Sequence, residues 1–146
     1  MKPGVAIALT ACAGGLVAMQ APINSKLGKA AGTFAAASIS FLIGTAILIA
    51  ITTISGKGAN LSEAAKLPWY YFTGGALGAA YVTTVLVSVR TLGAGGVTAA
   101  TIAGQLSTSV LIDRLGILGL PEKQVTAARV AGVLLLAAGV FLIVRE

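Results

Sequence analysis

Residues 33–54 read TFAAASISFLIGTAILIAITTI, without a single charged side chain. At about 1.5 Å per residue, a helix of this length spans roughly 30 Å, the thickness of the hydrocarbon core of a bilayer. The stretch therefore predicts a helix that crosses a membrane. Residues 3–25, 69–89 and 91–112 are equally free of charge, and 125–144 contains only Arg129.

Together these stretches predict an all-α integral membrane protein, a bundle of transmembrane helices in a single membrane domain over residues 1–146. Only short connectors remain between the stretches, although 61–66 can form one helical turn at the interface. The five helices are expected at about 3–25, 33–54, 69–89, 91–114 and 125–145.

The composition favours the same class. Charged residues make up 10% of the chain, against about 25% in a soluble domain. Apolar residues make up 57%, and the mean hydropathy is +0.97. The net charge of +6 comes from ten basic residues scattered over ends and connectors. Because they form no basic run, we expect no nucleic-acid partner, and lipid headgroups instead.

The first stretch contains Cys12 in a context that resembles a lipoprotein processing site. Only residues 5–9 would supply the apolar core of a signal peptide, which needs 7–15 residues. The apolar sequence also continues past Cys12 to Ala21. We therefore expect an uncleaved first span.

The basic residues give a weak orientation signal. In membrane proteins Lys and Arg are normally concentrated on the cytoplasmic side. With five spans the margin here is only six to four, so we expect a chain that inserts both ways up or pairs with a paralogue of opposite orientation. One side receives Lys2, Lys57, Lys66, Arg114, Lys123 and Arg129, and the other receives Lys26, Lys29, Arg90 and Arg145.

Signals of a soluble enzyme are absent from the sequence. It has no His, one Cys and four acids, which are Glu63, Asp113, Glu122 and Glu146. Their spacing fits neither a metal site nor a pair of catalytic carboxylates. We expect no enzyme activity, no metal and no cofactor.

Polar residues inside the spans are the candidates for function. Thr98, Thr101, Gln105 and Thr108 recur at steps of three and four residues, so they share one helix face. An amide at the depth of Gln105 needs partners, because hydrocarbon offers none. Two interpretations remain open, a cavity lined with hydrogen-bonding groups and simple bonding between helices. The predicted substrate-binding residues are Gln20, Asn24, Tyr81, Thr101, Gln105 and Thr108.

Asp113 is the acid nearest to a span. It is expected about 24 Å along its helix, close to the interface. One interpretation is a salt bridge to Arg129 at the start of the last span, and the other is a coupling site for a proton or cation. Small residues elsewhere predict close helix packing; the candidates are Gly44, Gly74, Gly78 and Gly104.

Several segments resemble the drug/metabolite transporter superfamily, most closely its YdcZ-type group of half-size, five-helix inner-membrane exporters. The similar segments are QAPINSKLG at 20–28, SFLIGT at 40–45, GGALGAAYV at 74–82, GQL at 104–106, LIDR at 111–114 and the Gly-containing last span at 131–140. The Gln-x-x-x-Asn and Gly-Gln-Leu…Ile-Asp pieces are the specific ones.

This resemblance implies a multi-pass protein of the bacterial inner membrane. Larger relatives join two five-helix repeats, and an odd number of spans makes the second repeat inverted. A five-helix chain is one half of that arrangement, completed by an antiparallel dimer with a second copy or a paralogue. The related four-helix multidrug exporters use a glutamate in their first helix, which has no counterpart here.

The expected function is a secondary transporter that exports a small metabolite or drug-like solute by alternating access. Without a carboxylate deep in a span, a neutral or zwitterionic solute suits the cavity better than a strongly cationic drug. Two alternatives remain open at this point, a dual-topology ion channel and a non-transporting accessory subunit of another membrane complex.

Overall fold

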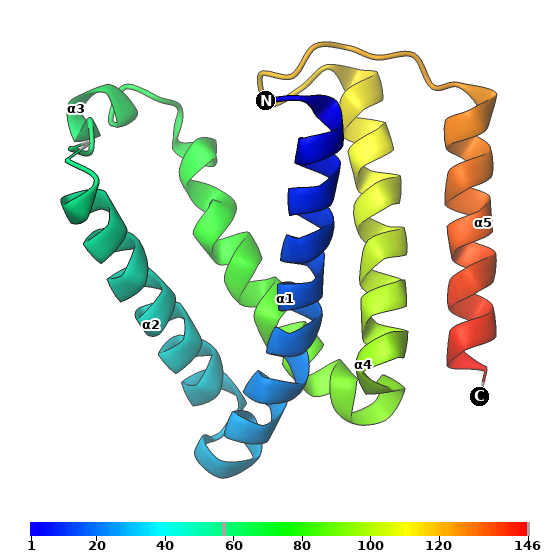
Figure 1. The fold of residues 1–146 in the computed structure, drawn as a ribbon, viewed down its shortest axis with the longest axis horizontal. Helices are drawn as coiled ribbons and strands as arrows, with labels where there is room; N and C mark the ends of the chain where they lie inside the picture. Colours follow the sequence, from blue (N-terminus) through cyan, green and yellow to red (C-terminus); the bar gives the residue numbers. More distant parts are fainter. Residues whose placement is uncertain (57, 146) are drawn as a thin grey trace. The chain divides into compact units, whose positions relative to one another are not determined.

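The structure is a computed structural model that describes residues 1–56 and 58–145. Lys57, one of the basic residues considered for orientation, and Glu146, one of the four acids, lie outside the described residues. The described part is helical and holds no strand, which confirms the all-α prediction for it, and four of its helices have the length and composition to cross a membrane. The elements are α1 (Pro3–Ala31), α2 (Thr33–Ile54), α3 (Leu61–Ala64), the 3-10 turn η1 (Trp69–Thr73), α4 (Gly74–Leu115) and α5 (Ala127–Val144) (Figure 1).

The chain divides into two compact units, Met1–Arg90 and a second unit that begins at Thr91. The boundary lies inside α4, next to Gly93, whose φ of 68° and ψ of 172° are not helical. Such a conformation is open essentially to glycine alone. α4 therefore consists of two helical segments, 74–92 and 94–115. At about 28 Å and 33 Å, each is long enough to cross the hydrocarbon core by itself.

α1 extends further than predicted. The sequence suggested an end near residue 25, whereas the helix runs through Pro22 and continues to Ala31. The prediction was wrong because it equated the first charges, Lys26 and Lys29, with the end of the helix. A helix of about 43 Å exceeds the hydrocarbon core, so its last turns carry charged side chains into the headgroup region.

In the first unit, α1 and α2 run antiparallel and are joined at Gly32, whose φ of 93° allows the tight reversal (Figure 1). Packing is concentrated near this joint. Leu86 of α4 is fully buried there, against Gly28 of α1. The remaining turns of α1 and α2 present apolar side chains outward, as helices surrounded by lipid do. The buried residues of this unit are Ala21, Asn24, Ser25, Gly28, Ala36, Ala37, Val82 and Leu86.

In the second unit, the 94–115 segment of α4 is followed by the connector 116–126 and by α5. Thr126 caps α5 by accepting a hydrogen bond from the backbone N–H of Arg129 at 3.3 Å. None of the described residues of α5 is buried, and most of its surface is apolar. The unit therefore offers lipid, or another protein, a large uncharged surface.

Candidate functional site

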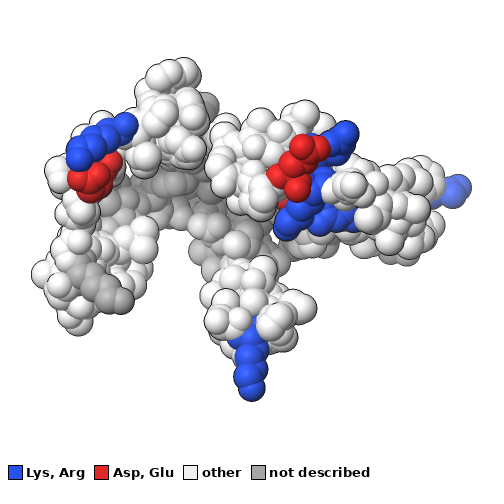
Figure 2. All heavy atoms as spheres, turned by 90° about the horizontal axis from the view of Figure 1, so that it is seen from above, with Lys and Arg blue, Asp and Glu red and all other residues white. Residues whose placement is uncertain are grey.

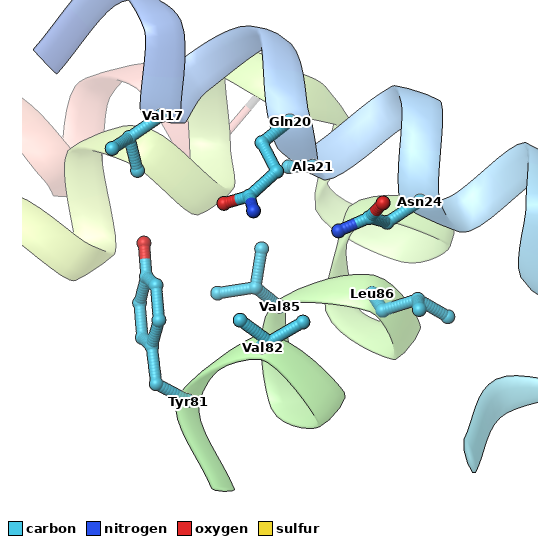
Figure 3. Close-up of a pocket in the computed structure, with 8 residues that line it drawn as sticks. All are labelled: Val17, Gln20, Ala21, Asn24, Tyr81, Val82, Val85 and Leu86. Atoms are coloured by element: carbon cyan, nitrogen blue, oxygen red, sulfur yellow. The ribbon is translucent and has the colours of Figure 1, made fainter. Parts of the chain in front are cut away.

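A small cavity lies in the first unit between α1 and the 74–92 segment of α4 (Figure 3). Its volume of about 10 Å³ is close to what one water molecule needs. The structure brings three predicted site residues together here, namely Gln20, Asn24 and Tyr81. The lining residues are Val17, Gln20, Ala21, Asn24, Tyr81, Val82, Val85 and Leu86.

The three polar groups differ in what they bind. The buried Asn24 amide donates a hydrogen bond to the Ser40 hydroxyl of α2 at 3.2 Å, which links α1 to α2. Within the described chain, neither the Gln20 amide nor the Tyr81 hydroxyl has a hydrogen-bond partner. Figure 3 shows the Gln20 side chain directed from α1 toward α4, and the Tyr81 hydroxyl directed toward α1. These two groups are therefore available to a ligand.

Sequence reasoning missed a polar contact near the joint between α1 and α2, where Ser25 meets Arg90. Ser25 follows Asn24 on α1 and is also buried. Its hydroxyl accepts a hydrogen bond from Nε of Arg90 at 3.4 Å. Arg90 entered the sequence analysis only as an orientation charge. The signal that could have flagged it is a lone cation at the end of a span that contains no acid.

The other three predicted substrate-binding residues lie on the 94–115 segment of the second unit. Thr101 is half-buried, whereas Gln105 and Thr108 are exposed on the single chain. The Gln105 amide has no hydrogen-bond partner among the described residues. By contrast, the neighbouring Ser107 hydroxyl is satisfied inside its own helix, because it donates to the Ala103 carbonyl at 2.8 Å. Gln105 is thus an exposed amide without a hydrogen-bond partner among the described residues, on a helix that is otherwise largely apolar.

Asp113 forms the ion pair that one interpretation predicted, with its Oδ2 3.0 Å from Nη1 of Arg129. Lys123 Nζ lies 4.0 Å from the same oxygen, and the Lys123 backbone N–H donates to the Asp113 carbonyl at 2.7 Å. Arg114 pairs with Glu122 close by. These pairs fasten the connector 116–126 to the end of α4, and the Asp113–Arg129 pair joins that end of α4 to the start of α5. Figure 2 shows the acidic side chains lying directly against basic ones.

The predicted packing glycines have different surroundings. A Cβ added at Gly78 would lie 3.2 Å from Cζ of Phe41, so α2 and α4 approach closely there. At Gly44, Gly74 and Gly104 such an atom would have no neighbour from another part of the described chain within 4 Å. Of these four glycines, Gly78 is therefore the one that makes a close helix contact among the described residues. The other three stay predictions, for contacts that a second chain would supply.

No group of three or more His, Cys, Asp or Glu side chains gathers anywhere in the described residues. The polar side chains described above are amides, hydroxyls and paired charges carried on helices of membrane-spanning length. Such an arrangement defines an integral membrane protein of the helical class.

Comparison with family profiles identifies the particular group within this class. Residues 5–142 match the family described as "Putative inner membrane exporter, YdcZ". The match covers nearly the whole chain, so the protein belongs to the YdcZ family of inner membrane exporters. Searches of curated proteins and of solved structures gave no significant match.

Proposed function

We propose that the chain is one half of an alternating-access transporter that exports a small neutral or zwitterionic solute. The observation that carries the proposal is the set of unpartnered polar groups, Gln20, Tyr81 and Gln105, on helices otherwise suited to lipid. A polar group facing hydrocarbon without a partner is costly. A solute with hydrogen-bonding groups would satisfy these side chains during transport.

The cavity in the first unit supports a half-site. Its volume of about 10 Å³ is far below the roughly 300 Å³ of a typical small-molecule pocket. A metabolite would bind only if a second set of helices completed the site. An antiparallel dimer with a copy or paralogue supplies such a set, as the inverted repeats of larger transporters do. The outward-facing Gln105 fits this arrangement, because a partner chain could reach it.

The charges in the helices bear on the class of solute. Asp113 is held by Arg129 at 3.0 Å near a helix end, and the cavity itself is lined by amides, a phenol and apolar groups. Amides and hydroxyls bind polar neutral groups without attracting one sign of charge. We therefore favour zwitterionic or neutral solutes over strongly cationic drugs. The family match favours the bacterial inner membrane as the place of action.

The test is transport by purified protein in liposomes, with a panel of labelled amino acids and small sugars. We expect saturable efflux that Gln105→Leu abolishes while insertion and thermal stability are kept, because leucine suits lipid better than glutamine. Ser107→Ala is the matched control, since its hydroxyl is already satisfied inside the helix at 2.8 Å. Unchanged efflux in Gln105→Leu would remove Gln105 from the site.

The same assay separates the two rival functions. An ion channel would give unsaturable flux of thousands of ions per second. An accessory subunit would move no solute from the panel unless another membrane protein were added. Saturable efflux by the purified chain alone would contradict both.

A further inference from the structure

The side chain of Arg90 contacts α1, which a charge that served only to orient the protein in the membrane would not need to do. It ends the first unit, where the 74–92 segment of α4 meets the last turns of α1. Its Nε lies 3.4 Å from the hydroxyl of the buried Ser25, and its Nη2 lies 3.0 Å from the position a Cβ would occupy on Gly28. The guanidinium thus lies along α1 and uses space that exists because residue 28 has no side chain.

The bonding capacity of this guanidinium is largely unused. Arginine has five N–H donors in a planar fork. In the described residues, the contact to Ser25 is the one side-chain hydrogen bond that Arg90 makes, and it is long. The described acid of the first unit is Glu63, which pairs with Lys66 at 2.6 Å and lies beyond the opposite end of α2. No carboxylate of this unit therefore neutralises Arg90.

The surroundings increase the positive potential. Lys26 and Lys29 lie on the same last turns of α1 as Ser25 and Gly28, and both are exposed. None of the ion pairs among the described residues includes either lysine. A planar fork beside a hydroxyl matches the paired oxygens of a phosphate or carboxylate, and the two lysines on the same turns of α1 add positive charge to this end of the unit.

We propose that Arg90 and Ser25, with Gly28 leaving room between them, form a binding site for an oxyanion group. The guanidinium gives two parallel N–H···O bonds, and the Ser25 hydroxyl fixes the fork. The ligand is either the phosphate of an anionic lipid headgroup or a soluble phosphate, because the chemistry of recognition is the same. This site is separate from the Gln20–Tyr81 cavity and does not depend on the proposed transport function.

The test measures binding to the full-length protein. In nanodiscs that mix phosphatidylglycerol with phosphatidylcholine, native mass spectrometry counts the anionic lipid that the protein retains. In detergent, inorganic phosphate is titrated while thermal unfolding is followed. Loss of charge-assisted hydrogen bonds predicts that Arg90→Gln weakens whichever ligand binds about tenfold or more. Arg145→Gln is the matched control, because it removes one exposed positive charge from the end of α5.

The outcomes separate the two sources and can reject the site. Phosphatidylglycerol retention that falls in Arg90→Gln but not in Arg145→Gln identifies a lipid site. Stabilisation by phosphate that disappears in the same variant identifies a soluble anion site. Arg90→Lys is expected to bind more weakly than the wild type, because lysine lacks the fork. Equal binding by Arg90→Lys and the wild type, or by Arg90→Gln and Arg145→Gln, would overturn the proposal.

Discussion

At the scale of single residues, Gly28 is the position where a missing side chain matters most. An added Cβ would lie 2.7 Å from Cδ2 of Leu86 and 3.0 Å from Nη2 of Arg90. The arginine could swing away, but Leu86 is fully buried and has little freedom to move. Gly28→Ala is therefore expected to destabilise the first unit by about 1–3 kcal/mol, the usual cost of overpacking.

The control for this prediction is Gly15→Ala, because no heavy atom beyond its own turn lies within 4 Å of that Cβ position. Alanine favours a helix over glycine by up to about 1 kcal/mol, so Gly15→Ala should be neutral or stabilising. Thermal unfolding of both variants in the same detergent makes the comparison. Equal melting temperatures would contradict the prediction, because they would show that Leu86 can move aside without a loss of stability.

At the scale of elements, the ion pair between Asp113 and Arg129 joins the end of α4 to the start of α5. The Asp113 side chain is 24% exposed and that of Arg129 is 33% exposed, so water screens the pair only in part. A double-mutant cycle with Asp113→Asn and Arg129→Gln should give a coupling energy of about 1 kcal/mol. The measurement is chemical or thermal unfolding of the four proteins in one detergent.

Transport by Asp113→Asn tests the other interpretation of this residue. A purely structural pair predicts that export continues with its pH dependence unchanged. A coupling site for a proton predicts loss of the pH dependence, even where the folded protein is as stable as the wild type. The second result would replace the structural role with a coupling role.

The elements also show what an apolar sequence can and cannot predict. The uncharged stretches predicted α2 at 33–54, because a run without charge is read directly as helix in a membrane. The predicted end of α1 was wrong, because charge marks where the hydrocarbon ends and not where the helix does. α4 passes Gly93 without a connector, because one glycine at a φ of 68° interrupts the helix without needing a loop.

At the scale of the molecule, the candidate site was harder to predict than the helices. The spacing of Gln20 and Asn24 placed both on one face of α1, and the cavity lies on that face. The sequence did not indicate which helix packs against this face, because contacts between apolar helices depend on shape rather than on a hydrophobic pattern. The role of Gly28 and the contact of Ser25 with Arg90 both depend on how α1 packs against α4. The sequence alone therefore could not predict them.

Orientation in the membrane belongs to the molecule as a whole. A margin of six basic residues to four is too small to fix one direction, so both orientations are expected in the wild type. Lys26→Gln with Lys29→Gln leaves six against two and should fix the N-terminus in the cytoplasm. Lys2→Gln with Lys66→Gln and Lys123→Gln leaves three against four and should favour the reverse.

Reporters fused to the C-terminus measure this directly, since the five predicted spans would place the two ends on opposite sides of the membrane. Alkaline phosphatase is active outside the cytoplasm, and a green fluorescent protein is bright inside it. The wild type should give both signals, and the first variant phosphatase activity alone. The second variant should gain fluorescence at the expense of phosphatase activity. The prediction fails if the wild type gives one signal and both variants give the same one. Orientation would then not be decided by these charges, and an antiparallel pair would require a paralogue.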